Sequence, residues 1–243
     1  IIINLSDTIH FGRLEGKILG SSLVENVELQ NYAKDGSEYR IDLEIQPMHA
    51  TNGELAGFMA IQLAYFDPLT KLASSRLLMD CLQQALVSSA RSKKQGALLF
   101  IAVDGVEQRN DSPDHDMGGM LQQQVALRLS NCVRGCDTLA RLESEEFVVL
   151  LEDLSENLQQ ATAQAEIIGN KILAEISKPY QLLSHQHSSS GNIGVTMFEG
   201  EKHKTDELMG QAGIALYQAR QIKEKHSGHN NIVFFRSGMR KKS

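Results

Sequence analysis

The chain has 243 residues, of which 42% are hydrophobic and 22% charged, a balance typical of a globular protein and not of a disordered one. Its formal net charge of −6 argues against a general nucleic-acid-binding protein, because such proteins carry a basic face. No apolar run approaches the roughly 18 residues that a membrane helix needs, and three cysteines without paired spacing, Cys81, Cys132 and Cys136, favour buried thiols in a reducing cytoplasm over a disulfide framework.

Three strands are predicted in the first quarter of the chain. Val27–Ala33 is followed by Asp35-Gly36, a dipeptide that favours a tight hairpin because both residues tolerate positive φ. Tyr39–Ile45 then alternates apolar and polar residues, which indicates a strand with one buried face. Asn52-Gly53 predicts a second turn, and Leu55–Leu63 alternates again. The sequence therefore predicts a small three-stranded antiparallel meander.

From residue 65 onward the pattern changes to alternating helices and strands. Helices carry apolar residues at helical spacing, and buried strands appear as short apolar runs. The predicted elements are a helix over Ser75–Arg91, a strand over Ala97–Val103, a helix around Leu121–Leu129, strands over Thr138–Leu142 and Phe147–Leu151, a helix capped by Ser155, a strand over Ile193–Phe198, a helix starting at Thr205 and a strand over Ile232–Phe235. This order predicts an α/β (α+β) fold, in which helices flank a central sheet.

Four short motifs occur in a fixed order along this second region. They are Asp67-Pro68-Leu69-Thr70-Lys71-Leu72; Val103-Asp104-Gly105 followed by Asn110 and His115; Asp137 followed by Ala140-Arg141-Leu142-Glu143-Ser144-Glu145-Glu146-Phe147; and Ala215-Leu216-Tyr217-Gln218-Ala219-Arg220. Together they resemble the GGDEF domain, the diguanylate cyclase family that joins two GTP molecules into cyclic di-GMP. The resemblance implies a cyclase-type sheet and places this domain at residues 65–236.

The flanking segments resemble two other signalling modules. Glu28–Gln62 is similar to the C-terminal half of a PAS sensor domain, so residues 1–64 are expected to be a partial PAS-like domain. Gly228–Met239 resembles the junction between a GGDEF and an EAL phosphodiesterase domain, so residues 237–243 are expected to begin a linker to an EAL domain in the same chain. Because the chain starts at Ile1 and not at Met, we expect a piece of a longer protein, with membrane segments upstream left open. Homodimers are implied as well, since PAS and GGDEF domains commonly pair.

The resemblance implies an active site that has lost its metal and phosphate contacts. The family binds metal ions through two carboxylates, because hard divalent cations prefer oxygen ligands. Ala102 occupies the first of these positions and has no oxygen to offer. Glu145 occupies the second and is the remaining metal candidate, with a solvated hairpin charge as the alternative. Glu107 replaces a lysine that neutralises phosphates, which reverses the local charge.

The signature turn and the guanine site also depart from the family pattern. Glu143 and Ser144 stand where the family has Gly-Gly, which accepts positive φ and lets a nucleotide approach the backbone. Gly119 replaces an acid that reads guanine, whereas its partner Asn110 is retained, either as a weak ligand or as a turn residue. The signature Glu143, Ser144, Glu145, Glu146 and Phe147 is therefore degenerate. No catalytic residue and no cofactor is expected, apart from Mg²⁺ if a nucleotide binds.

Arg134-Gly135-Cys136-Asp137 lies five residues ahead of the signature. In the family, Arg-x-x-Asp at this offset is an inhibitory site that binds cyclic di-GMP. The Arg134 fork can bind guanine O6 and N7, and Asp137 can accept the guanine N1 and N2 hydrogens. The alternative is an ordinary surface ion pair. His185–His187 is predicted to be a polar loop and not a metal site.

Three functions remain open. The first is a catalytically inactive regulatory module in cyclic di-GMP signalling, which binds cyclic di-GMP at Arg134 and Asp137 and regulates a downstream phosphodiesterase domain. The second is a weakly active diguanylate cyclase, although GTP condensation is not expected. The third is a dimerisation or scaffold element. A cytoplasmic location is predicted, without a nucleic-acid partner and without a membrane segment in these residues.

Overall fold

The computed structural model describes residues 25–32, 38–49, 55–63, 65–104, 115–142, 146–183, 185–225 and 230–240. Contacts between Cα atoms divide the chain into two units, Ile1–Ala64 and Tyr65–Ser243. The described part of the first unit holds a three-stranded sheet, and the second unit holds a five-stranded sheet with its helices.

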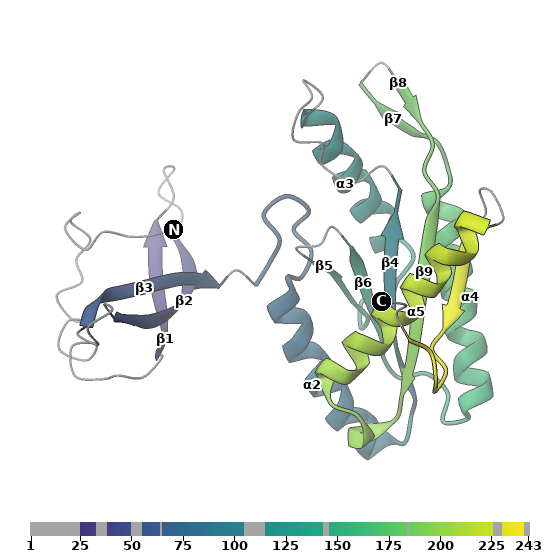
Figure 1. The fold of residues 1–243 in the computed structure, drawn as a ribbon, viewed down its shortest axis with the longest axis horizontal. Helices are drawn as coiled ribbons and strands as arrows, with labels where there is room; N and C mark the ends of the chain where they lie inside the picture. Colours follow the sequence, from purple (N-terminus) through teal and green to yellow (C-terminus); the bar gives the residue numbers. More distant parts are fainter. Residues whose placement is uncertain are drawn as a thin grey trace. The chain divides into compact units, whose positions relative to one another are not determined.

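The first unit contains an antiparallel meander (Figure 1). Its strands are β1 (Glu25–Tyr32), β2 (Glu38–His49) and β3 (Leu55–Leu63). β2 is the middle strand and pairs antiparallel with both neighbours. The predicted meander is confirmed, whereas the predicted turns at Asp35-Gly36 and Asn52-Gly53 lie outside the described residues.

The second unit is built on a sheet with the strand order β10-β9-β4-β6-β5. The strands are β4 (Gly96–Val103), β5 (Thr138–Arg141), β6 (Phe147–Leu151), β9 (Gly191–Phe198) and β10 (Asn231–Phe234). β10 is parallel to β9, and the other neighbours are antiparallel. Every residue of the central β4 is buried, as expected for an apolar strand covered on both faces. The predicted α/β (α+β) class is confirmed.

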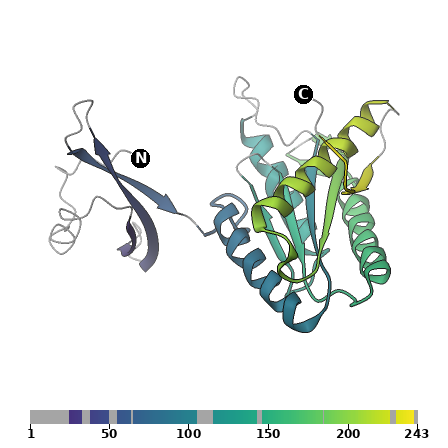
Figure 2. The same ribbon diagram turned by 60° about the horizontal axis from the view of Figure 1, so that its bottom comes forward.

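Two helices cover each face of this sheet (Figures 1 and 2). α2 (Ser75–Ser92) and α5 (Thr205–Lys225) lie on one face, and α3 (His115–Ser130) and α4 (Leu158–Ile176) lie on the other. Successive side chains of β4 point to opposite faces. Phe100 therefore packs in the cluster of α2 and α5, and Ile101 in the cluster of α3 and α4. Among the described helices, none is both long and apolar enough to cross a membrane.

The helix ends follow capping rules. Ser74 caps α2 by accepting a hydrogen bond from a helical N–H, and Lys93 ends the helix in the left-handed conformation (φ 62°). The cap of α4 is Asn157 and not Ser155, so the prediction of the capping residue is wrong. Ser155 instead accepts a hydrogen bond from the Asn157 N–H. The capping side chain is thus the one immediately before the first helical residue.

A small hairpin precedes β9. Its strands are β7 (Tyr180–Leu182) and β8 (His185–His187), which pair antiparallel, so the prediction of a polar loop at His185–His187 is wrong. Arg128 of α3 holds this region. Its guanidinium donates to the carbonyls of Glu175 and Pro179, and it stacks over the Tyr180 ring at 3.6 Å from the centroid.

α5 lies directly against β9 at Gly194. A Cβ atom at this position would lie 2.1 Å from the Leu216 nitrogen and 2.4 Å from the Ala212 carbonyl oxygen. Two residues further along β9, the Thr196 hydroxyl donates to the Gln211 side chain at 2.7 Å. The helix backbone therefore rests directly on the strand, and only glycine fits there.

Candidate functional site

The residues of the sequence motifs lie at two opposite ends of the five-stranded sheet. Because β4 and β6 are antiparallel, with Ile101 opposite Phe147, the end of β4 and the start of β6 share one end. We call this the signature end, formed by Ala102, Arg141 and Glu146. The other end, which we call the turn end, is formed by Arg134, Asp137 and Glu152, which lie before β5 and after β6.

The first predicted metal position lies at the signature end and is apolar. Ala102 is 7% exposed, and its cross-strand partner on β9 is Asn192, which is 1% exposed. Asp104 follows β4, but its backbone N–H donates to the Ser190 carbonyl at 2.9 Å, and its carboxylate accepts the Ser190 hydroxyl. The methyl side chain of Ala102 offers no oxygen to a divalent cation, so it cannot take the place of a carboxylate ligand.

Several predicted site residues cannot be placed. Glu107, Asn110, Glu143, Ser144 and Glu145 lie outside the described residues. Gly119 is described, on α3, where an added Cβ would first meet Leu69 Cδ1 at 3.8 Å. Across the residues that the structure describes, no group of three or more His, Cys, Asp or Glu side chains could hold a metal ion.

The signature hairpin consists of β5, β6 and the residues between them. A backbone hydrogen bond joins its two sides next to the ends of the strands. We call Arg141, Leu142 and Glu146 the hairpin base. The Leu142 N–H donates to the Glu146 carbonyl at 2.8 Å. On the β5 side, Arg141 Nη1 lies 2.8 Å from Asp67 Oδ2, and the two side chains are only 12% and 14% exposed. This ion pair fixes the end of β5 against the segment that precedes α2.

Asp67 is the centre of a tight turn. Its Oδ1 accepts hydrogen bonds from the Thr70 N–H at 2.7 Å and from the Thr70 hydroxyl at 2.6 Å. Burial by itself raises the pKa of Asp67, but the hydrogen bonds from Thr70 and the charge of Arg141 outweigh burial and lower this pKa. The motif that contains Asp67 was recognised in the sequence, but its pairing with Arg141, 74 residues away, was not predicted.

Glu146 makes the equivalent contact on the β6 side. Its Oε1 lies 3.1 Å from Arg220 Nη2 on α5, with side-chain exposures of 21% for Glu146 and 48% for Arg220. These two residues are also 74 positions apart. Both belong to motifs recognised in the sequence, but the spacing of motifs along the sequence does not predict which of them lie close together in space. The pair is more exposed than the one between Asp67 and Arg141.

At the turn end, Arg134 and Asp137 form a local turn. The Asp137 N–H donates to the Arg134 carbonyl at 3.0 Å, and the Arg134 N–H donates to Asp137 Oδ2 at 2.8 Å. Asp137 Oδ1 also accepts the Glu152 N–H at 3.4 Å. The contacts that join Arg134 and Asp137 in the structure run through the backbone N–H and carbonyl of Arg134, and the alternative of an ordinary surface ion pair stays a prediction. The Arg134 side chain is exposed.

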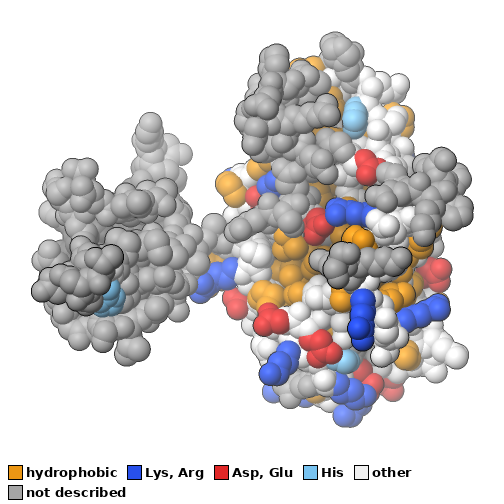
Figure 3. Space-filling model, in the orientation of Figure 1, with side chains coloured by type: hydrophobic (Ala, Val, Ile, Leu, Met, Phe, Trp, Pro, Cys, Tyr) orange, Lys and Arg blue, Asp and Glu red, His pale blue; other side chains and the backbone are white. Residues whose placement is uncertain are grey.

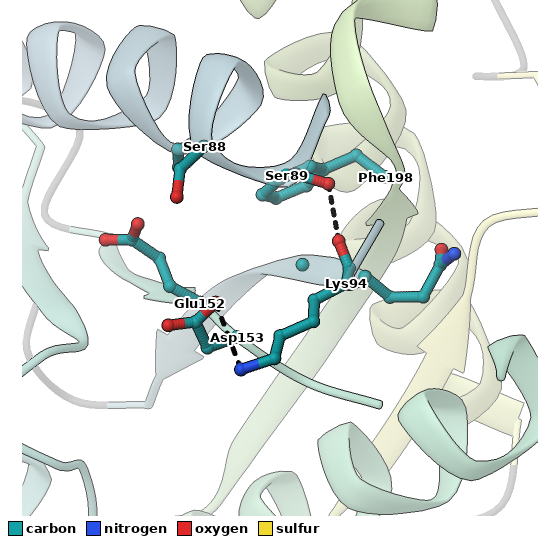
Figure 4. A pocket seen from close by; sticks show the side chains of 9 residues that line it. Ser88, Ser89, Lys94, Glu152, Asp153 and Phe198 are labelled. Atoms are coloured by element: carbon teal, nitrogen blue, oxygen red, sulfur yellow. Dashed lines mark hydrogen bonds and ion pairs between the residues drawn. The ribbon is translucent and has the colours of Figure 1, made fainter. Parts of the chain in front are cut away.

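A shallow hollow adjoins the turn end (Figure 4). It is lined by Ala85, Ser88, Ser89, Lys94, Gln95, Gly96, Glu152, Asp153 and Phe198. Lys94 reaches Asp153 at 3.6 Å, and the Ser89 hydroxyl donates to the Lys94 carbonyl at 2.5 Å. Burial raises the pKa of Glu152, and the charges of Asp153 and Asp137 raise it further. The sequence did not predict this cluster of carboxylates.

The visible surface of the second unit carries mixed charge. On the face that Figure 3 shows, acidic and basic side chains are interspersed around hydrophobic side chains that lie over the sheet between α2 and α5. A protein that binds nucleic acid along such a face gathers its basic side chains into one patch or stripe. The charges of this face do not form such a patch.

Comparisons with known proteins lead to one family. The family model for "Diguanylate cyclase, GGDEF domain" matches residues 64–226. From Pseudomonas aeruginosa, the "Bifunctional diguanylate cyclase/cyclic di-GMP phosphodiesterase MucR" is 37% identical over 190 residues, which are 78% of this chain and 26% of that protein. The "Cyclic di-GMP phosphodiesterase NbdA" of the same organism is 29% identical over 174 residues, 72% of this chain and 21% of that protein. The chain thus spans a minor part of both relatives.

A solved structure gives the same result for the fold. The GGDEF domain of TpbB from Pseudomonas aeruginosa, determined on its own, matches with a TM-score of 0.61 at 28% identity, over 70% of this chain and 94% of that one. The match therefore accounts for nearly the whole of the solved domain.

Proposed function

The chain belongs to the GGDEF domain family of diguanylate cyclases, and we propose that it serves cyclic di-GMP signalling as a regulatory module that does not itself condense GTP. The observation that carries this proposal is Ala102. It lies near the end of β4, where the resemblance to the family places a metal-binding acid, and its surroundings are buried. Without that carboxylate, Glu145 is the one expected carboxylate ligand left for the cations that must hold the phosphates of GTP.

Three further departures in the sequence support the absence of turnover. Glu107 stands where the family has a phosphate-binding lysine, and a charge pair at close range contributes roughly 4 kcal/mol in either direction at an effective dielectric near 20. Glu143 and Ser144 replace the two glycines that let a nucleotide approach the turn. Gly119 replaces the acid that reads guanine. Each loss removes a different kind of contact, so the losses accumulate.

We propose that cyclic di-GMP binds at the turn end. The Arg134 side chain is exposed, so its planar fork is available for guanine O6 and N7. The Asp137 carboxylate already accepts two backbone N–H groups, but a carboxylate offers about four lone-pair sites. Asp137 can therefore still accept the guanine N1 and N2 hydrogens, and Arg134 is expected to supply the larger share of affinity.

Isothermal titration of the 243-residue chain with cyclic di-GMP tests this ligand site. The proposal expects saturable binding that Arg134→Ala removes. The control is Arg236→Ala, which replaces an exposed arginine that follows β10 in the sequence and should leave binding unchanged. Equal binding by both variants would place the ligand away from Arg134 and reject this site, and no heat at all would leave only a structural role for the domain.

Turnover is measured separately, with GTP and Mg²⁺ or Mn²⁺. The regulatory proposal expects no cyclic di-GMP above background. The similarity to MucR, whose name includes diguanylate cyclase activity, favours weak synthesis as the second candidate function. Product that disappears in Glu145→Ala would establish that second function and reject the first.

The proposal extends to the neighbouring segments. We propose that residues 1–64 are a partial PAS-like input domain, that an EAL phosphodiesterase domain follows residues 237–243, that the protein is cytoplasmic and that the chain forms homodimers. The names of MucR and NbdA, which both include phosphodiesterase activity, support the proposal of a following EAL domain. Sedimentation equilibrium of the whole chain tests dimerisation, and a single species at the monomer mass would reject it. A dimer that binds neither nucleotide would favour the scaffold function.

A further inference from the structure

We propose that the hairpin base couples the segment by which the chain enters the second unit, Tyr65–Ser74, to the segment that follows the last strand, Arg236–Arg240. This inference deepens the regulatory function proposed above and rests on it for its biological use. The observation behind it is that the hairpin base contacts both segments: Arg141 binds the first directly, and Glu146 reaches the second through α5.

The entering segment is a rigid turn. The Ser74 N–H donates to the Tyr65 carbonyl, and the Asp67 N–H donates to the Leu72 carbonyl, each at 2.8 Å. The Arg76 guanidinium lies over the Tyr65 ring, 5.4 Å from its centroid. Tyr65, the first residue of the second unit, is thus fixed to the start of α2. A displacement at Tyr65 cannot be absorbed by a loose linker inside this segment.

The same segment is bonded to β5. The Ala73 N–H donates to the Leu139 carbonyl at 3.2 Å, and the Arg141 N–H donates to the Ala73 carbonyl at 2.9 Å, which makes a parallel bridge between Ala73 and Ala140. The Asp67–Arg141 ion pair adds a nearly buried charged contact at 2.8 Å. Two backbone hydrogen bonds and one ion pair therefore connect the entering segment to β5, and Arg141 of the hairpin base makes one of these hydrogen bonds and the ion pair.

α5 makes the connection on the other side. Arg220 binds Glu146 at 3.1 Å, and Gln218, two residues earlier on the same helix, donates to the Arg240 carbonyl at 3.0 Å. The segment at Arg240 is itself turned, because the Met239 N–H donates to the Arg236 carbonyl at 3.0 Å. One turn of a packed helix thus holds both the hairpin base and the segment after β10.

The two connections differ in strength, so substitutions in them should disturb the unit by different amounts. A pair that is 12% and 14% exposed is shielded from water, whereas a pair that is 21% and 48% exposed is partly solvated and contributes less. Disrupting Asp67 should therefore disturb the region around Arg240 more than disrupting Arg220 disturbs the turn at Asp67. Proximity alone does not prove coupling, so the test measures an effect at a distance.

The experiment is hydrogen–deuterium exchange of the whole 243-residue chain, without nucleotide, in Asp67→Asn and in Arg220→Gln. Asp67→Asn is expected to accelerate exchange by about fivefold in peptides covering 231–240, a factor at the lower end of typical coupling between sites. This acceleration should exceed any change in the peptides that cover α4. Arg220→Gln is expected to give a smaller acceleration in peptides covering 65–74. Lys178→Gln, which removes the exposed ion pair with Glu175, is the matched control and should change neither region.

The proposal fails if each substitution changes only its own side of the hairpin base, or if Asp67→Asn accelerates 231–240 and α4 equally, since that would be global loosening. If Asp67→Asn does not fold, Thr70→Val, which removes only the hydroxyl bond to Asp67, takes its place with the same criteria. Because no nucleotide is present, this result is independent of the titration and turnover assays, and either proposal can fail alone.

Discussion

The two ends of the five-stranded sheet are built from different kinds of contact. At the signature end, Arg141 and Glu146 pair with residues 74 positions away in the sequence. At the turn end, Asp137 binds backbone N–H groups three and 15 positions away. The signature end therefore depends on how the whole unit is assembled, whereas the turn at Arg134 forms locally. A site built on a local turn therefore depends less on the assembly of the whole unit than a site built on long-range pairs.

The largest expected effect tests whether the two ends share one cooperative unit. Gly194→Ala places a Cβ atom 2.1 Å from the Leu216 nitrogen, in the middle of the strand that joins the two ends. We expect a loss of about 3 kcal/mol in the free energy of unfolding, because backbone must move to relieve the overlap. Urea denaturation followed by circular dichroism measures the loss, and hydrogen exchange should rise at both ends together.

The matched control for this substitution is Gly135→Ala. An added Cβ at Gly135 meets nothing within 4 Å, so the free energy of unfolding should change by less than about 0.5 kcal/mol. If Gly194→Ala loosened one end and left the other protected, the two ends would have to be treated as separate folding units.

At the signature end, Asp67→Asn should cost about 2 kcal/mol at pH 7, because a charged hydrogen bond and its shielded arginine partner are lost. The pKa of Asp67 is lowered in the folded protein. Its contribution is therefore complete above the unfolded pKa, near pH 4, and disappears as the pH falls through the folded pKa. In urea titrations of both proteins between pH 7 and pH 3, the difference in the free energy of unfolding should shrink as the pH falls below 4. A difference that stays constant with pH would contradict this account.

At the turn end, the corresponding substitution should have a smaller effect. Asp137→Ala removes the acceptor for the Arg134 N–H, and we expect a cost of about 1 kcal/mol, the usual net value of such a bond. Arg134→Ala, on an exposed side chain, should leave stability within about 0.5 kcal/mol of the parent. Thermal unfolding of the two variants separates these values. A cost for Asp137→Ala as large as that for Asp67→Asn would erase the distinction between the ends.

The smallest predicted effect is a gain in stability and not a loss. Burial and the neighbouring charges raise the pKa of Glu152, so the folded protein loses stability as the pH rises from the unfolded pKa to the folded one. Glu152→Gln should therefore stabilise the protein by about 0.5 kcal/mol at pH 7 and have no effect below about pH 4. The same urea titrations measure it. Destabilisation at neutral pH would show that the Glu152 carboxylate makes a favourable contact.

The elements that were predicted correctly carry local signals. β3 and β6 have the predicted bounds, Leu55–Leu63 and Phe147–Leu151, because alternation and apolar runs are properties of a few consecutive residues. β7 and β8 were missed because strands of three residues are too short to show a period. At α4, Ser155 and Asn157 are both good capping residues, and only the position of the first helical turn decides between them.

The candidate site was predictable as a set of residues but not as an arrangement. The sequence motifs alone identify Arg134, Asp137, Ala102 and Glu146 as candidate site residues. The Asp67–Arg141 pair could not be predicted, since it depends on a bridge between Ala73 and Ala140 that forms only when the sheet assembles. The raised pKa of Glu152 likewise depends on the assembled fold, because burial is its main cause, followed by the charges of Asp153 and of Asp137, which a turn brings to the Glu152 N–H.

The position of β10 has a consequence for how the protein is made. Among the described strands of the second unit, β10 comes last in sequence, yet it covers the edge of β9. Asn230 secures it by accepting the Gly191 N–H at 2.8 Å and donating to the Ser177 hydroxyl at 2.6 Å. A ribosome must therefore release nearly the whole unit before β9 gains its outer neighbour. Until then the open strand edge can pair with another nascent chain, so chaperone protection matters most in the final moments of translating this unit.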